Sequence, residues 1–203
     1  LSSLGSMKEF TEGIGIWREV KGSLRALFAV EMLYLVPNIM FNTILILYLV
    51  NDLGVTEVQL GQLFSIVGLA MIALAIPSGK LIDRFGRVKP LLFSFALISV
   101  TLPILLKDAS FFQLVLATPV IGLINIVFNS ATQALWADLI PEDKRGRVIG
   151  SKSFFSLILT AIGSLAGGLV YEYISHTLPV YLYILINIPC FAITWLYIKD
   201  PER

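Results

Sequence analysis

The stretch GKLIDRFGRVKP, residues 79–90, is a dense group of charges between two oily segments. Five of its twelve side chains are charged, whereas the runs FSIVGLAMIALAIPS before it and LLFSFALISVTLPILL after it carry no charged residue. A helix that crosses a bilayer needs roughly 20 mostly apolar residues. The stretch is therefore predicted to be a tight turn between two membrane-spanning helices.

The whole chain repeats this alternation of long apolar blocks and short polar connections. Hydrophobic residues make up 57% of the sequence and charged residues 14%, whereas an ordinary soluble domain carries about 25% charged residues. The short connections leave no room for a soluble domain. We predict an all-α integral membrane fold, a bundle of six transmembrane helices, with residues 1–22 as a cytoplasmic or interfacial linker and 23–203 as the transmembrane domain. The six apolar blocks run over about 24–50, 58–79, 89–106, 111–136, 149–171 and 178–198.

The distribution of lysine and arginine orients these helices. With six spans, the basic residues of the N-terminal segment, of 80–89, of 144–152 and of the tail all fall on one side of the membrane. The other side holds a single cation, Lys107. Cytoplasmic loops carry an excess of Lys and Arg, so we expect both chain ends to be cytoplasmic, in what we expect to be a prokaryotic cytoplasmic membrane.

The charged turn also has a specific spacing. It resembles the loop signature of the major facilitator superfamily, which joins the second and third helices of a six-helix half and occupies that place here. The resemblance implies that its Asp and Arg residues tie helix ends together in one transport conformation, and that Asp138, in the similar segment WADLIPEDKRGRVIG (136–150), pairs with Arg84 or Arg87. A plain positive anchor is the alternative. The matching residues are Gly79, Asp83, Arg84, Gly86, Arg87 and Lys89.

The resemblance extends from about residue 17 to the end and implies a function. Members of this family move a small solute by alternating access between two six-helix halves, each a 3+3 inverted repeat, by symport or antiport and in many cases with protons. The segment 7–22 resembles the linker before the second half, so the chain is read as a C-terminal half. The other half, in the same polypeptide or as a second copy, is then the expected partner, together with membrane lipid and the solute. No enzyme activity, metal, cofactor or nucleic-acid partner is expected.

A different class of function stays open beside this one. The chain could be a stand-alone six-helix membrane protein that acts as a homodimeric assembly or a binding module. A run of glycines, Gly163-Ser164-x-x-Gly167-Gly168, resembles the antiporter motif of the family but lacks its proline. We therefore interpret Gly163 and Gly167 as a face for close helix packing, because small residues let helix backbones approach each other in lipid.

Two stripes of polar residues are candidates for a solute cavity. Their members recur every three or four positions and so share one face of a helix, and polar residues within membrane spans usually face a bundle interior or a cavity. The alternative is hydrogen bonding between helices. The predicted cavity residues are Tyr34, Asn38 and Asn42 in the first block, and Asn125, Asn129 and Gln133 in the fourth.

Glu31 is a carboxylate about two turns inside the first block. It is a candidate for proton coupling or for binding a cationic solute, with pairing to Lys152 or contact with water as the structural alternatives. His176, in a short loop, is predicted to be solvated. Tyr171 and Tyr183, near span ends, are assigned to the interfacial aromatic belts.

Overall fold

The structure is a computed structural model that describes residues 22–106 and 109–200. The predicted linker, 1–22, lies outside the described residues except for Gly22. Within the described ranges the chain is helical and contains no strand. The helices are α2 (Ser23–Leu47), α3 (Glu57–Phe85), α4 (Val88–Thr101), α5 (Phe111–Leu139), α6 (Arg145–Tyr173) and α7 (Leu178–Tyr197), with a π-helical turn η1 (Tyr48–Asp52) and 3-10 turns η2 (Leu102–Leu105) and η3 (Glu142–Lys144).

Five of these helices are long and apolar enough to cross a membrane. They coincide with five of the six predicted blocks, and α3 continues well beyond the predicted end at residue 79. The helix of the third block, Val88–Ile104, keeps within two residues of the predicted bounds but is shorter than the other five. Pro103 lacks a backbone N–H and lies where the α-helix tightens into η2. At 1.5 Å per residue this helix is about 25 Å long, less than the roughly 30 Å of a hydrocarbon core.

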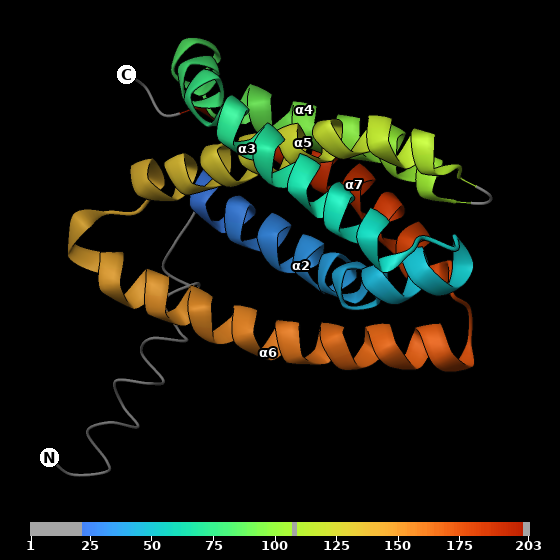
Figure 1. The fold of residues 1–203 in the computed structure, drawn as a ribbon. Coiled ribbons are helices and arrows are strands. Elements are labelled where there is room, and N and C mark those ends of the chain that lie inside the picture. The colour runs from blue at the N-terminus through green and yellow to red at the C-terminus, as the bar shows by residue number, and fades with distance from the viewer. Residues whose placement is uncertain (1–21, 107–108, 201–203) are drawn as a thin grey trace, which may run out of the picture.

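Local sequence signals start two of the long helices. Thr56 before α3 and Ser110 before α5 each accept a hydrogen bond from the backbone of a glutamine three residues later, and that glutamine's side chain bonds back to the cap. This reciprocal capping box satisfies two backbone donors that a helix start leaves without partners. Both caps lie at the same end of the bundle, where α2 turns into α3 and α4 into α5 (Figure 1).

The helices run alternately in opposite directions, so the predicted cytoplasmic elements gather at one end, on the left in Figure 1. The opposite end carries the acidic residues Asp52, Glu57 and Glu172, and no lysine or arginine among the residues that the structure describes. The basic residues of the described loops therefore lie at the end of the bundle opposite to these acidic residues. The exposed cations of the described elements at that end are Arg25, Lys80, Arg84, Lys89, Arg145, Arg147 and Lys199.

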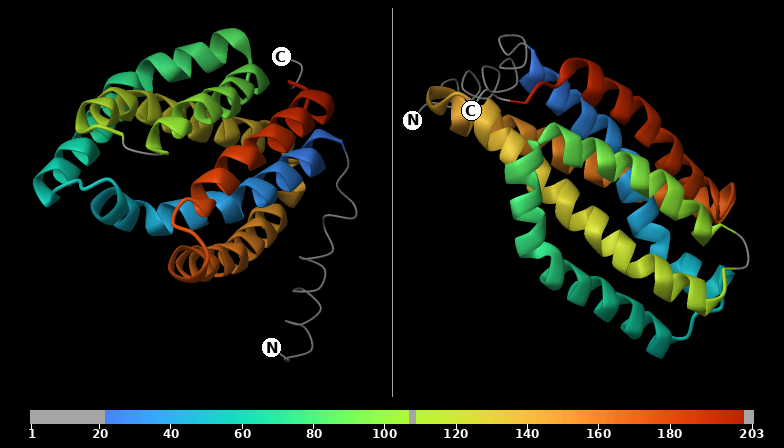
Figure 2. Two further views of the ribbon diagram at one scale, coloured as in Figure 1. Left: turned by 90° about the vertical axis from the view of Figure 1, so that its right-hand side faces the viewer. Right: turned by 90° about the horizontal axis from the view of Figure 1, so that it is seen from above.

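Helix packing centres on α2 and α5. Helix α2 lies between α6 and α7, while α5 packs against α3 and α4, and α4 also contacts α7 (Figure 2). The contact between α2 and α6 is close because α6 presents Gly163 and Gly167 there: a Cβ at Gly163 would lie 3.1 Å from the Val36 carbonyl oxygen, and one at Gly167 would lie 2.8 Å from the Met40 carbonyl oxygen. The close-packing interpretation of these glycines is confirmed.

Candidate solute pathway

A cavity of about 230 Å³ lies between α2 and α5, with η1, α3, α4, η2 and α7 completing its walls. Three of the six predicted cavity residues line it: Asn38 and Asn42 from α2 and Asn125 from α5. Most of the other lining side chains are apolar, including Phe41 and Phe64. The structure thus brings the two predicted asparagine stripes together across one space.

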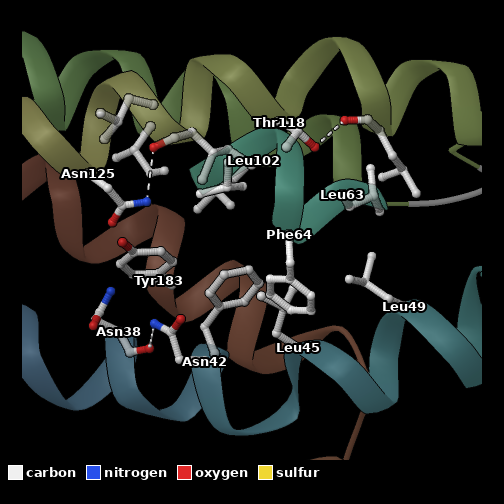
Figure 3. Close-up of a pocket in the computed structure, with 16 residues that line it drawn as sticks. Asn38, Asn42, Leu45, Leu49, Leu63, Phe64, Leu102, Thr118, Asn125 and Tyr183 are labelled. Atoms are coloured by element: carbon white, nitrogen blue, oxygen red, sulfur yellow. Dashed lines mark hydrogen bonds between the residues drawn. The ribbon is translucent and has the colours of Figure 1, made fainter. Parts of the chain in front are cut away.

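The amide groups of this cavity are held by their own helices. Asn42 Nδ2 donates to the Asn38 carbonyl at 2.8 Å, and Asn125 Nδ2 donates to the Ile121 carbonyl at 2.9 Å. Figure 3 shows Asn38 and Asn42 on one side of the space and Asn125 on the other. These hydrogen bonds fix the orientation of the amide groups. They use only the NH₂ group as donor, because a backbone carbonyl is an acceptor, so the amide oxygens stay available as acceptors.

Tyr183 of α7 also lines the cavity, and sequence reasoning missed it. Its side chain is 5% exposed, its hydroxyl bonds to the Tyr34 hydroxyl, and its ring stacks on Phe41 with centroids 5.2 Å apart. The assignment of Tyr183 to an interfacial belt is therefore wrong. The signal that could have found it is Asn187 one turn later, a second polar residue on the same face of an otherwise apolar helix.

The three remaining predicted residues do not line this cavity. Tyr34 lies behind it, where its hydroxyl accepts from Asn38 Nδ2 at 3.4 Å and its ring stacks on Phe128. Asn129 is exposed and donates to the Asn125 carbonyl at 2.8 Å. Gln133 lines a second cavity, of about 620 Å³, at the predicted cytoplasmic end. The predicted polar stripe on α5 is therefore divided between two cavities, with Asn125 in the first and Gln133 in the second.

Glu31 lies in this second cavity with two partners. Its Oε1 is 2.8 Å from Lys152 Nζ of α6, and its Oε2 accepts a hydrogen bond of 2.6 Å from Trp136 Nε1 of α5. The Lys152 ammonium lies 4.4 Å from the centre of a Trp136 ring, a cation–π contact. Glu31 thus ties α2 to α5 and α6. The structural alternative for Glu31, pairing with Lys152, is present in the structure.

The charged turn joins further helix ends. Arg87 Nε is 2.6 Å from Asp138 Oδ2 at the end of α5, so the predicted pairing of Asp138 is found with Arg87. An unpredicted residue, Asp200, accepts hydrogen bonds from the backbone N–H of Arg87 at 2.6 Å and of Val88 at 3.0 Å, and so caps the start of α4. The other residues of the predicted loop signature do not take part in these contacts between helix ends. Asp83, Arg84 and Lys89 are exposed, Arg84 lies over the Phe85 ring, and Gly79 has open space where a side chain would be.

Gly86 is the position in this turn that requires glycine. Its φ is +87°, and a Cβ there would lie 2.5 Å from Asp200 Oδ2. We expect Gly86→Ala to lower the free energy of unfolding by about 2 kcal/mol, because the backbone conformation is strained for any side chain and the Asp200 cap is displaced. The thermal midpoint of the detergent-solubilised chain measures this. Gly79→Ala is the matched control, and an equal loss in both variants would contradict the argument.

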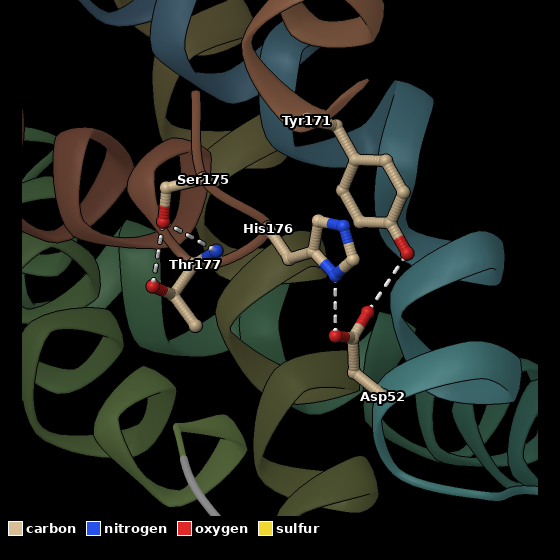
Figure 4. A network of polar contacts seen from close by, with 5 residues as sticks. All are labelled: Asp52, Tyr171, Ser175, His176 and Thr177. Atoms are coloured by element: carbon tan, nitrogen blue, oxygen red, sulfur yellow. Dashed lines mark hydrogen bonds and ion pairs between the residues drawn. The ribbon is translucent and has the colours of Figure 1, made fainter. Parts of the chain in front are cut away.

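A separate polar cluster closes the opposite end of the bundle (Figure 4). Asp52, at the end of η1, accepts a hydrogen bond from the Tyr171 hydroxyl at 2.8 Å and contacts His176 Nδ1 at 2.6 Å, while the imidazole stacks on the Tyr171 ring. Tyr171 is buried, so its assignment to an aromatic belt is wrong, and His176 is not simply solvated although it is half exposed. The cluster holds the end of α2 against the α6–α7 turn.

Comparison with known proteins adds one finding. The sequence model of the Major Facilitator Superfamily matches residues 27–203, which includes all six helices except the first residues of α2. No curated protein matches the chain.

Proposed function

The chain belongs to the major facilitator superfamily, and we propose that it forms one six-helix half of a secondary active transporter that moves a small solute by alternating access. Members of this superfamily are transporters rather than enzymes, and the long apolar helices make the chain an integral membrane protein. The observation that carries the proposal is the cavity between α2 and α5, where asparagines from two helices far apart in sequence face the same space.

The proposed half is a 3+3 inverted repeat. In this repeat α2, α3 and α4 correspond to α5, α6 and α7 in that order. The contacts of α2 with α6 and α7 then correspond to the contacts of α5 with α3 and α4, and both sets are present. A close glycine contact occurs in both sets, since a Cβ at Gly122 of α5 would lie 3.1 Å from the Val67 carbonyl oxygen of α3. Such repeats place a solute site at their interface.

The partner in this proposal is a second six-helix half, either in the same polypeptide or as another copy. Helices α3 and α6 bury few of their side chains within the bundle and leave large apolar residues exposed. Those faces are available to lipid and to the second half. The orientation with both ends in the cytoplasm, and the place of this chain as the C-terminal half, are parts of the same proposal.

Proton coupling through Glu31 is proposed in a specific form. A proton on Glu31 would cancel its charge and release Lys152, so one uptake event would loosen the contact of α2 with α6. Proton uptake measured with the transported solute should be lost in Glu31→Gln. Uptake that survives this substitution would leave Glu31 with a structural role.

Accessibility of the cavity tests the transport proposal. Single cysteines at Asn38, Asn42 and Asn125, in a chain carrying Cys190→Ala, should react with a membrane-impermeant thiol reagent in native membranes. Because alternating access opens the site to each side in turn, reaction is expected from both faces of the membrane. Ile188→Cys, at an exposed apolar position of α7, is the unreactive control. Absence of reaction at all three asparagine positions would contradict the proposal.

A further inference from the structure

The walls of the first cavity carry no formal charge. None of the sixteen residues that line it is acidic, basic or a histidine. A charged group that entered would lose its hydration without gaining a counter-ion on this face, which is costly. The chemistry of the walls therefore favours an uncharged solute.

The nearest carboxylate on α2 does not supply the missing charge. Glu31 lines the second cavity instead, where both of its oxygens are engaged, one by Lys152 and the other by Trp136. The two cavities thus differ in character, since the second also contains Arg145. Charge is concentrated at the predicted cytoplasmic end and is absent from the asparagine-lined walls.

Hydrogen-bond acceptors remain available among the polar groups of the first cavity. The Oδ1 atoms of Asn42 and Asn125 have no hydrogen-bond donor among the described residues, while each NH₂ group gives one N–H to a backbone carbonyl and keeps the other. The Thr118 hydroxyl donates its hydrogen bond to the Leu114 carbonyl at 2.6 Å, which leaves its oxygen as an acceptor. A solute that donates O–H or N–H hydrogen bonds would satisfy these oxygens.

We propose that the solute is an uncharged, amphipathic small molecule whose O–H or N–H groups donate to Asn42 and Asn125 while its apolar part packs against Phe41 and Phe64. This inference rests on the proposed transport function and specifies its substrate class. Aromatic and aliphatic walls with a few placed polar groups are typical of small-molecule sites. The amides orient the solute, and the rings bury its apolar surface.

Three thiol reagents of similar size test the electrical preference of the cavity. Methanethiosulfonates with a hydroxyethyl, a trimethylammonium-ethyl or a sulfonatoethyl group are reacted with Asn42→Cys and Asn125→Cys in the full chain carrying Cys190→Ala. Each rate is divided by the rate of the same reagent with a free thiol in solution. We expect the hydroxyethyl reagent to react about tenfold faster than either charged reagent, because removing a charged group from water costs free energy.

Two controls show that the assay reports charge. Ser153→Cys lies in the second cavity beside Lys152 and Arg145, so it should favour the sulfonatoethyl reagent. Adding Asn42→Asp to Asn125→Cys places one negative charge in the first cavity and should shift its preference to the trimethylammonium reagent. Circular dichroism confirms that each variant is folded.

The outcomes separate the substrate class from the transport proposal. If a charged reagent matches the hydroxyethyl reagent at both asparagine positions, the cavity accepts charge and the proposed class is overturned, while the pathway stands. If no reagent reacts at either position while Ser153→Cys reacts, the cavity is closed to water, and the pathway fails together with the class. A clear preference for the hydroxyethyl reagent at both positions supports the inference.

Discussion

Replacing Gly167 by valine is expected to lower the free energy of unfolding by about 3 kcal/mol, because the added carbons meet backbone rather than a movable side chain. A Cβ at this position would lie 2.8 Å from the Met40 carbonyl oxygen and 2.9 Å from the Met40 Cα. Helix α6 would have to move away from α2 along this contact. Equilibrium unfolding in mixed detergent micelles measures the loss.

The neighbouring glycine provides the control for this experiment. Gly168 is exposed and has nothing within 4 Å of its would-be Cβ, so Gly168→Val should change stability by no more than about 0.5 kcal/mol. Both variants carry the same change in helix propensity. Equal effects of the two substitutions would mean that close packing at Gly167 is not what holds α6 in place.

Replacing Glu31 by glutamine is expected to cost about 2–3 kcal/mol, because Lys152 would be left in the bundle without its counter-ion. The value lies below that of a fully buried pair, since the two side chains are 21% and 24% exposed. The Trp136 indole can still donate to the glutamine oxygen, so the loss of stability measures the effect of removing the negative charge. Unfolding of the detergent-solubilised variant measures it.

A double-mutant cycle isolates the contribution of this ion pair. Lys152→Gln alone should also destabilise the chain, whereas the double variant Glu31→Gln/Lys152→Gln should lose less than the sum, with a coupling of about 1–2 kcal/mol. Glu172→Gln, at an exposed position of α6, should be close to neutral. Additive effects would show that Glu31 and Lys152 do not stabilise each other.

Most of the fold could be predicted from the sequence, because hydropathy and charge act over whole segments. Apolar blocks of about the thickness of a membrane must become helices in lipid, and lysine and arginine orient them. The third block, predicted over about 89–106, is a helix over Val88–Ile104, so its bounds were predicted as well. Hydropathy does not express the change of helix type at its end, where the chain passes from α-helix into η2 around Pro103.

Site residues could be predicted only where the spacing of polar residues along one helix shows that they lie on the same face. Asn38, Asn42 and Asn125 could be grouped because residues three or four apart lie on one side of a helix. The rest depends on contacts between distant segments. Tyr183 enters the cavity from α7, and Asp200 caps α4 from 112 residues further along the chain. No local pattern encodes such pairs.

The cap that Asp200 places on α4 has a consequence for biosynthesis. The same terminal segment also meets the start of α2, where the Lys199 backbone N–H donates to the Ser23 hydroxyl at 3.0 Å. These residues are the last of the described chain to leave the ribosome, yet they cap α4 and contact the first residue of α2, two helices made much earlier. The charged turn therefore remains uncapped while α5, α6 and α7 are being synthesised and inserted. Closure of this end of the bundle is a late step of assembly, and a chain that stops before Asp200 leaves the backbone N–H groups of Arg87 and Val88 without this acceptor.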